Sequence, residues 1–229
     1  GRLAAIGELC TSVAHGIRNP LAAIQSSAQL ARDASRAAHE DHERIDDILR
    51  ETKRLGDRVN GLMKIARVSA QEFADTSLGE VTRVAVQAVR AEVENRGLSL
   101  EVESSAAYVR GDKRLLEQAV IELISNAMEH CKPGGTIRVT CLNGDRKARL
   151  TVADDGPGVA AAVRDQIFDL FFTTKPSGTG IGLATVKRVA RLHGGDVELE
   201  CPPGGGSRFC IALPAQKRSI RKKKTKLED

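Results

Sequence analysis

The chain has 229 residues, enough for one large domain or two small ones with a sizeable core. Apolar residues make up 41% and charged residues 28%, as in an ordinary globular protein. Aromatic residues make up only 3%, which argues against a nucleic-acid platform built on base stacking, because stacking needs exposed rings. The sequence contains no apolar run of about 18 residues and no signal-peptide pattern, so we expect no transmembrane helix within it.

The formal net charge of +5 belongs to the end of the chain. Residues 217–229 hold seven basic and two acidic residues, whereas residues 1–216 hold 28 of each. We therefore expect a solvated, disordered basic tail and no specific nucleic-acid binding; weak contact of the tail with nucleic acid or anionic lipid is the alternative.

The number of cysteines is odd and no Cys-x-x-Cys pair occurs, so neither a disulfide framework nor a zinc site fits. We expect small buried apolar side chains in a reducing, cytoplasmic compartment. The five residues are Cys10, Cys131, Cys141, Cys201 and Cys210.

An apolar rhythm with steps of three and four residues runs through residues 3–67 and predicts two helices joined by the polar segment Arg36–Glu43. Such a period is typical of the seam between supercoiled helices. One hairpin cannot cover both of its apolar stripes, so we expect two hairpins to pair as a four-helix bundle, and hence a homodimer. The seam of the second helix is predicted at Ile45, Ile48, Thr52, Leu55, Val59, Leu62 and Ala66.

The rhythm stops after Arg67, and the following pattern predicts an α+β sandwich with helices on one face of a mixed, mostly antiparallel sheet. The predicted elements are a helix at 78–96, a strand at 98–103, a helix at 115–130 capped by Asp112, strands at 136–142 and 148–153 around an Asn143–Gly144 turn, a helix at 179–193, and strands at 196–201 and 207–213. The predicted segments are a helical hairpin (1–67), a linker with a first strand (68–77), a second domain (78–214) and a tail (215–229).

His15 falls on the outward side of the first predicted helix. Pro20 removes the helical hydrogen bond to the carbonyl of Gly16, so the helix is weakened beside the histidine. Asn19 follows one turn later on the same side. An exposed imidazole is a good nucleophile near neutral pH, although most exposed histidines have no catalytic role.

Two further motifs carry polar groups that suit a phosphate-containing ligand. Glu122 and Asn126 lie four residues apart on a predicted helix, and the amide oxygen of Asn126 suits a hard cation such as Mg²⁺. Asp154 follows an apolar strand and precedes Gly156 and Gly158, which allow a flat ligand to approach the backbone. Each motif alone is equally compatible with an ordinary helix or turn.

A glycine-rich stretch follows the segment Phe171-Phe172-Thr173-Thr174-Lys175 and opens a helix. Amides at a helix N-terminus attract phosphate oxygens. The stretch Gly178–Leu183 is not a Rossmann fingerprint, because Leu183 replaces the third glycine, and no Gly-Lys-Ser/Thr follows as in a Walker loop.

The order of these motifs resembles the catalytic core of bacterial sensor histidine kinases over about residues 1–214, in the nitrogen-regulatory-like form with Phe-Phe-Thr-Thr-Lys and a short lid. The resemblance implies the Bergerat ATP-binding fold. The matching boxes are the phosphoacceptor box His15–Leu21, the asparagine box Glu122–Asn126, the glycine boxes Asp154–Gly158 and Gly178–Gly182, and the phenylalanine box Phe168–Phe172.

The resemblance implies a role for each matching position. His15 would attack the γ-phosphate of ATP and then pass the phosphoryl group to an aspartate of a response regulator, with Asn19 serving dephosphorylation of that regulator. Asn126 would bind Mg²⁺, and Asp154 would receive the adenine amino group. The other implied nucleotide-binding positions are His130, Gly156, Gly158, Thr174, Lys175, Gly178, Thr179, Gly180, Ile181, Gly182 and Leu183. Any membrane attachment would lie in parts outside this chain.

Two positions depart from the family pattern and leave alternatives open. Gly16 stands where an acid usually follows the phosphoacceptor, and general-base help is typically worth roughly 10²–10⁴-fold in rate. A pseudokinase scaffold is therefore the alternative to an active protein-histidine kinase. Glu122 stands where the family has asparagine and would be catalytic in a third interpretation, an ATPase switch of the gyrase type.

Overall fold

The computed structural model describes residue 17 and the ranges 21–22, 24–32, 39–67, 73–175 and 178–216. The chain divides into two compact units, residues 1–69 with 159–192, and residues 70–158 with 193–229. This grouping separates residues 159–192 from the rest of the predicted domain, 78–214. The domain boundaries given in the sequence analysis therefore remain predictions. The basic tail, 217–229, and Cys10 lie outside the described residues.

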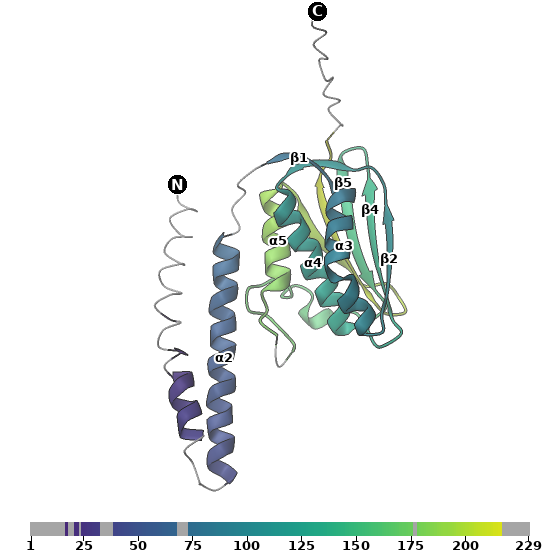
Figure 1. Ribbon diagram of the computed structural model, residues 1–229. Coiled ribbons are helices and arrows are strands. Elements are labelled where there is room, and N and C mark those ends of the chain that lie inside the picture. Colours follow the sequence, from purple (N-terminus) through teal and green to yellow (C-terminus); the bar gives the residue numbers. More distant parts are fainter. Residues whose placement is uncertain are drawn as a thin grey trace, which may run out of the picture. The chain divides into compact units, whose positions relative to one another are not determined.

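The predicted helical hairpin is confirmed. Helix α2 spans His39–Arg67, and residues 24–32 form a helix beside its first half (Figure 1). An ion pair of 3.3 Å between Arg32 and Asp46 joins the two helices. Along the predicted seam of α2, Thr52 and Val59 are buried, while Ile48 and Leu55 remain 48% and 44% exposed. A single hairpin thus leaves part of its apolar stripe uncovered.

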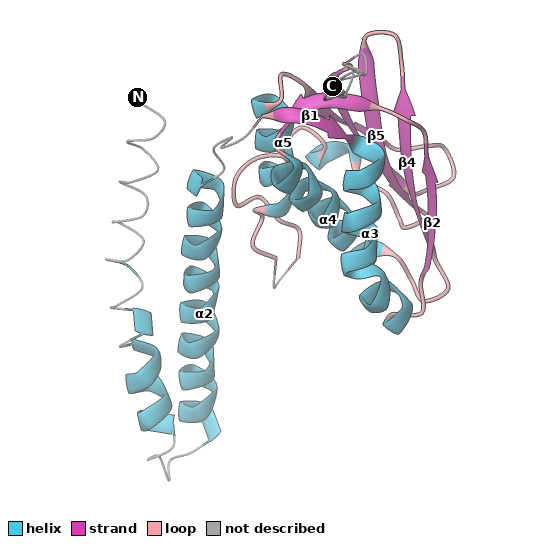
Figure 2. Cartoon of the chain, turned by 45° about the horizontal axis from the view of Figure 1, so that its top comes forward, coloured by secondary structure: helices cyan, strands magenta, loops and turns pink. Residues whose placement is uncertain are grey.

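The second unit contains a five-stranded sheet in the order β2-β4-β5-β7-β6. Figure 2 labels the neighbouring strands β2, β4 and β5. The pair β2–β4 is parallel and every other pair is antiparallel, as predicted. The predicted turn lies where β4 ends at Asn143, and residues 144–146 join it to β5 at Lys147. The strands are β2 (Ser99–Ser104), β4 (Thr136–Asn143), β5 (Lys147–Asp154), β6 (Asp196–Glu200) and β7 (Ser207–Pro214).

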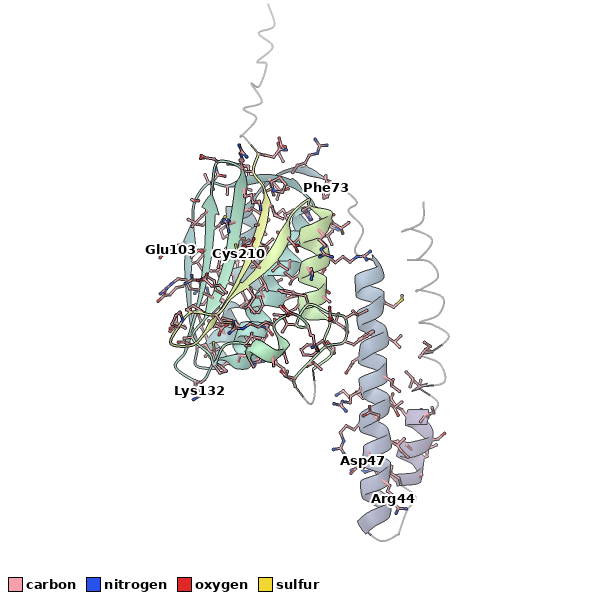
Figure 3. The ribbon with its side chains drawn as sticks, turned by 180° about the vertical axis from the view of Figure 1, so that it is seen from behind. Arg44, Asp47, Phe73, Glu103, Lys132 and Cys210 are labelled. Carbon is pink, nitrogen blue, oxygen red and sulfur yellow. The ribbon has the colours of Figure 1, made fainter. Side chains whose placement is uncertain are left out.

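Helices α3 (Leu78–Asn95) and α4 (Lys113–His130) cover one face of this sheet (Figure 1). Their apolar residues recur every three or four positions, so each helix buries one stripe against the strands. Asp112 caps α4 as predicted: its side chain accepts hydrogen bonds from the amides of Arg114 and Leu115. On the opposite face of the sheet lie polar side chains, among them Glu103 and Cys210 (Figure 3).

A second, two-stranded sheet pairs β1 (Ala74–Ser77) with β3 (Tyr108–Gly111). The sequence analysis predicted the first of these strands and missed β3, because four residues ending in glycine carry no alternating pattern of their own. The pairing with β1 defines the strand. The hydroxyl of Thr76 also donates to the carbonyl of Gly111, at 2.9 Å.

The unit that contains residues 159–192 holds a 3₁₀ turn, η1 (Ala161–Val163), and helix α5 (Gly182–Leu192). The prediction that this helix begins at residue 179 is wrong by three residues. Gly180 has φ +66°, a left-handed conformation that an α-helix cannot contain, so the helix begins only after it.

The prediction of uniformly buried cysteines is correct only for Cys141 among the described ones. Burial raises the pKa of the Cys141 thiol to about 11. Cys131, Cys201 and Cys210 are half-buried, and none of the four described cysteines forms a disulfide. Within the described ranges, no helix is both long and apolar enough to cross a membrane.

Candidate nucleotide-binding site

Helix α4 carries three of the predicted site residues on one face. Glu122, Asn126 and His130 follow each other at intervals of four residues, and each is half-buried. The helix is fixed beneath them by Leu123 and Ala127, which are almost fully buried. Carboxylate and amide oxygens of this kind are the ligands that Mg²⁺ prefers, so the donor set fits a magnesium ion held partly by phosphates and water.

Asp154 ends β5, and its carboxylate is fixed by two backbone amides. Its Oδ1 accepts hydrogen bonds from the amide of Gly156 at 2.9 Å and from that of Ser207 at 3.3 Å. Among the described residues, none donates a hydrogen bond to Oδ2. The half-buried carboxylate therefore keeps one oxygen for a donor on a ligand.

Two glycine turns interlock around this carboxylate. The amide of Gly206 donates to the carbonyl of Gly156 at 2.7 Å. Gly158 and Gly206 have φ of +76° and +84°, and a Cβ on Gly206 would lie 2.3 Å from the carbonyl oxygen of Asp154. Larger residues would force the turns apart, so the shape of the loop depends on glycine at both positions.

The C-terminal end of α4 packs against the glycine turn that contains Gly156. A Cβ on Gly156 would lie 2.9 Å from Asp154 Oδ1 and 3.1 Å from the carbonyl oxygen of His130. The structure thus places the C-terminal end of the asparagine-box helix beside the first glycine box. Sequence reasoning missed Gly206 and Ser207, although the run Gly204-Gly205-Gly206 before a strand was a usable signal.

The pKa of the Cys131 thiol, directly after α4, is affected by burial and by the carboxylates of this region. Burial raises the pKa of its thiol, and the nearby carboxylates of Asp154 and Asp155 raise it further, to about 11. The thiol is therefore protonated at neutral pH and is a poor nucleophile.

The remaining described positions lie in the other unit. There a backbone hydrogen bond between Phe171 and Gly180 closes the glycine-rich stretch into a loop, which we call the clasp. The amide of Phe171 donates to the carbonyl of Gly180 at 2.9 Å. Phe171 has φ +71° and is the one non-glycine residue with positive φ in the described chain. Such a conformation is strained and persists only where the surroundings enforce it.

Inside the clasp, side chains shape the turn that carries Lys175. The hydroxyl of Thr173 accepts a hydrogen bond from the amide of Lys175 at 3.1 Å. Lys175 is half-buried and Thr174 is exposed. A Cβ on Gly178 would lie 2.2 Å from the Thr173 hydroxyl, so this turn also requires glycine.

The clasp leads directly into the first turn of α5. Ile181 is buried, and its carbonyl accepts hydrogen bonds from the amide and the hydroxyl of Thr185, at 2.9 and 3.0 Å. The backbone amides at the start of α5 have no helical partner, which makes them suitable donors to phosphate oxygens. This stretch supplies the other predicted positions, Thr179, Gly182 and Leu183, all half-buried.

The structure therefore assembles two groups of predicted residues, each within its own unit. The α4 face lies against the Asp154 loop in one, and the clasp leads into α5 in the other. His15, Gly16 and Asn19 lie outside the described residues, so the phosphoacceptor box stays a prediction at the level of geometry.

Comparison with known families agrees with this arrangement. Residues 5–71 match the His Kinase A (phospho-acceptor) domain. Residues 111–217 match the histidine kinase-, DNA gyrase B- and HSP90-like ATPase family. The first match includes the position of His15, and the second includes both glycine boxes.

Individual relatives point to the same family. The sensor histidine kinase ZraS of Klebsiella oxytoca is 34% identical over 216 residues, or 93% of this chain and 47% of ZraS. The mycobacterial sensor histidine kinase MprB is 31% identical, with a TM-score of 0.59 over 63% of this chain and 99% of that structure. The histidine kinase ThkA, solved in complex with the response regulator protein TrrA, is 25% identical, with a TM-score of 0.66 over 94% of this chain and 63% of that one.

These matches confirm the resemblance read from the motifs: the chain belongs to the sensor histidine kinases, and it contains the phosphoacceptor and ATPase-like regions that form their catalytic core. The chain spans about half the length of the curated relative that it matches.

The clasp generates a prediction about Gly180. A Cβ there would lie 2.3 Å from the carbonyl carbon of Phe171, whereas nothing lies within 4 Å of a Cβ on Gly97, which has nearly the same φ of +68°. Both alanine variants bear the left-handed strain of about 1–2 kcal/mol, but only Gly180→Ala also meets the backbone of Phe171. We expect limited proteolysis within 172–179 to accelerate in Gly180→Ala alone. Equal proteolysis rates in the two variants would contradict the clasp.

Proposed function

We propose that this chain is the catalytic core of a two-component sensor histidine kinase. It binds ATP, transfers the γ-phosphoryl group to His15, and passes it to an aspartate of a response regulator. The observation that carries the proposal is the Asp154 carboxylate, oriented by two amides inside interlocked glycine turns and closed by the helix of Asn126. The family matches support it.

In this proposal the second unit, which contains α4, recognises the adenine base and the metal ion. Asp154 accepts a hydrogen bond from the adenine amino group through Oδ2, and the glycines at 156 and 158 leave room for the flat ring. Asn126 holds Mg²⁺ through its amide oxygen, and Glu122 lies one turn away on the same helix. When bound, Mg²⁺ neutralises charge on the phosphates.

The clasp and α5 serve the phosphates. The amides at the start of the helix, including those of Gly180 and Gly182, donate to phosphate oxygens, and Lys175 supplies positive charge. Phosphoryl transfer needs little covalent help from the protein, so orientation of the nucleotide is most of what this unit contributes.

The transfer itself uses the neutral imidazole of His15. One ring nitrogen forms a bond to the γ-phosphorus while the bond to the bridging oxygen of ADP breaks, and ADP leaves with that electron pair. The phosphohistidine then gives its phosphoryl group to the aspartate carboxylate of the regulator. Asn19 orients water for the reverse task, removal of phosphate from the regulator.

We further infer a homodimer that acts in the bacterial cytoplasm, with a response regulator receiver domain as its partner. The uncovered apolar stripe of the hairpin supports the dimer. The solved complex of ThkA with TrrA supports a regulator as partner.

Incubation with γ-labelled ATP tests the proposed activity. We expect acid-labile label on the wild type and none on His15→Ala. Absence of label with retained ATP binding would favour the pseudokinase scaffold, and release of free phosphate alone would favour the ATPase switch.

The same assay measures the effect of Gly16. We expect Gly16→Glu to label faster than Gly16→Ala, because only the glutamate adds a carboxylate that can take the imidazole proton, an effect of roughly 10²-fold or more where a base limits the rate. Alanine controls for the stiffer helix. A wild type that labels as fast as Gly16→Glu would show that this site needs no adjacent acid.

The dimer predicts the effect of charge at the seam. Leu55 is 44% exposed in a single chain and would be buried in a four-helix bundle. Leu55→Asp places an unpaired charge there, which costs several kcal/mol, so sedimentation should show a monomer. Lys53→Asp, outside the predicted seam, should remain dimeric. A monomeric wild type would overturn the bundle.

A further inference from the structure

The second unit, residues 70–158 with 193–229, contains a buried histidine, His193, that is not among the predicted site residues. It follows α5 in sequence and is only 6% exposed. Its Nε2 accepts a hydrogen bond from the backbone amide of Asp112 at 2.9 Å. Its ring also contacts the ring of Phe73, with centroids 4.9 Å apart and planes at 54°.

These contacts connect three points that are far apart in the sequence. Phe73 immediately precedes β1, where the chain enters the catalytic unit after the hairpin (Figure 3). Asp112 is the N-cap of α4, and the register of the small sheet pairs Ala74 with Gly111, directly before Asp112. His193 therefore lies where the entry strand meets the start of α4.

The fit around the imidazole is close. A Cβ on Gly111 would lie 2.5 Å from Cδ2 and 2.9 Å from Nε2 of His193, so glycine makes the approach possible. An Nε2 that accepts from an amide belongs to an imidazole without a proton on that atom. Without this acceptor, the part-buried Asp112 amide would lose its partner, and the start of α4 would shift to recover one.

We propose that His193 is a positioning residue: it fixes the start of α4 and thereby the placement of Asn126 toward magnesium. The inference rests on the proposed function, because it takes Asn126 as the magnesium ligand. Asn126 lies about 21 Å along the helix from Asp112, at 1.5 Å per residue. Because backbone hydrogen bonds join the successive turns of a helix, we expect a shift at its capped end to change the position of Asn126.

Phe73 extends this connection toward the hairpin. Its ring lies against the imidazole, and it directly precedes β1 in the sequence. Movement of the entry strand would reach α4 through Phe73, His193 and the Asp112 amide in turn. The same positioning residue thus connects the entry strand β1 to the helix that carries the proposed metal ligand.

The test measures the magnesium gain, which is the ratio of dissociation constants of a non-hydrolysable ATP analogue without and with magnesium, by calorimetry on the full chain. His193→Leu fills the space without an acceptor, and His193→Gln restores an acceptor near the position of Nε2. We expect the leucine variant to lose about tenfold of the gain, the equivalent of one hydrogen bond, and the glutamine variant to retain it.

Val197→Ala is the matched control, because Val197 is 7% exposed on the neighbouring strand β6 and does not contact the Asp112 amide. It should lower the melting temperature and leave the magnesium gain unchanged. If His193→Leu does not fold, Gly111→Ala, which displaces the imidazole, takes its place with the same expected loss.

The outcomes separate the two proposals. A wild-type magnesium gain that Asn126→Ala abolishes and His193→Leu preserves would overturn the positioning role and leave the proposed site intact. A wild type without magnesium gain, or one whose gain survives in Asn126→Ala, would overturn the proposed metal site and the inference with it.

Discussion

The site depends above all on one carboxylate and the two amides that hold it. Asp154 Oδ1 accepts from Gly156 on its own turn and from Ser207 on the paired strand β7, so one oxygen ties two loops together. A Cβ on Gly206 would meet the carbonyl oxygen of Asp154 on the other loop, and a Cβ on Gly156 would meet Asp154 Oδ1 and the carbonyl oxygen of His130. With Oδ1 occupied, the outward role falls to Oδ2. In the proposed function, ligand recognition and local folding use different oxygens of the same residue.

Local patterns predicted most of the fold. The stripes of α3 and α4, the Asp112 cap and the turn at Asn143–Gly144 lie within short windows, so the sequence alone indicates them. Strand β3 and the late start of α5 were missed because they depend on pairing with β1 and on the clasp at Gly180.

The same distinction applies to the site. The boxes of the proposed site could be predicted because each has a local spacing, whereas Ser207 and His193 form hydrogen bonds with partners 53 and 81 positions away. No periodicity reports such contacts. Gly111 is an example of a residue whose role the sequence does not indicate. In the sequence it is one glycine before a helix, and in the structure it contacts the His193 ring so closely that a Cβ would not fit.

The central claim is that Asp154 accepts a hydrogen bond from the adenine amino group. The affinities of the protein for two purine nucleotides test this claim most directly. The wild type and Asp154→Asn are titrated with ATP and with the triphosphate of purine riboside, which lacks the amino group. We predict that the wild type prefers ATP by about tenfold or more, as expected for a hydrogen bond to a charged group, and that Asp154→Asn loses most of this preference. Equal affinities in the wild type, or an unchanged preference in the variant, would contradict the assignment.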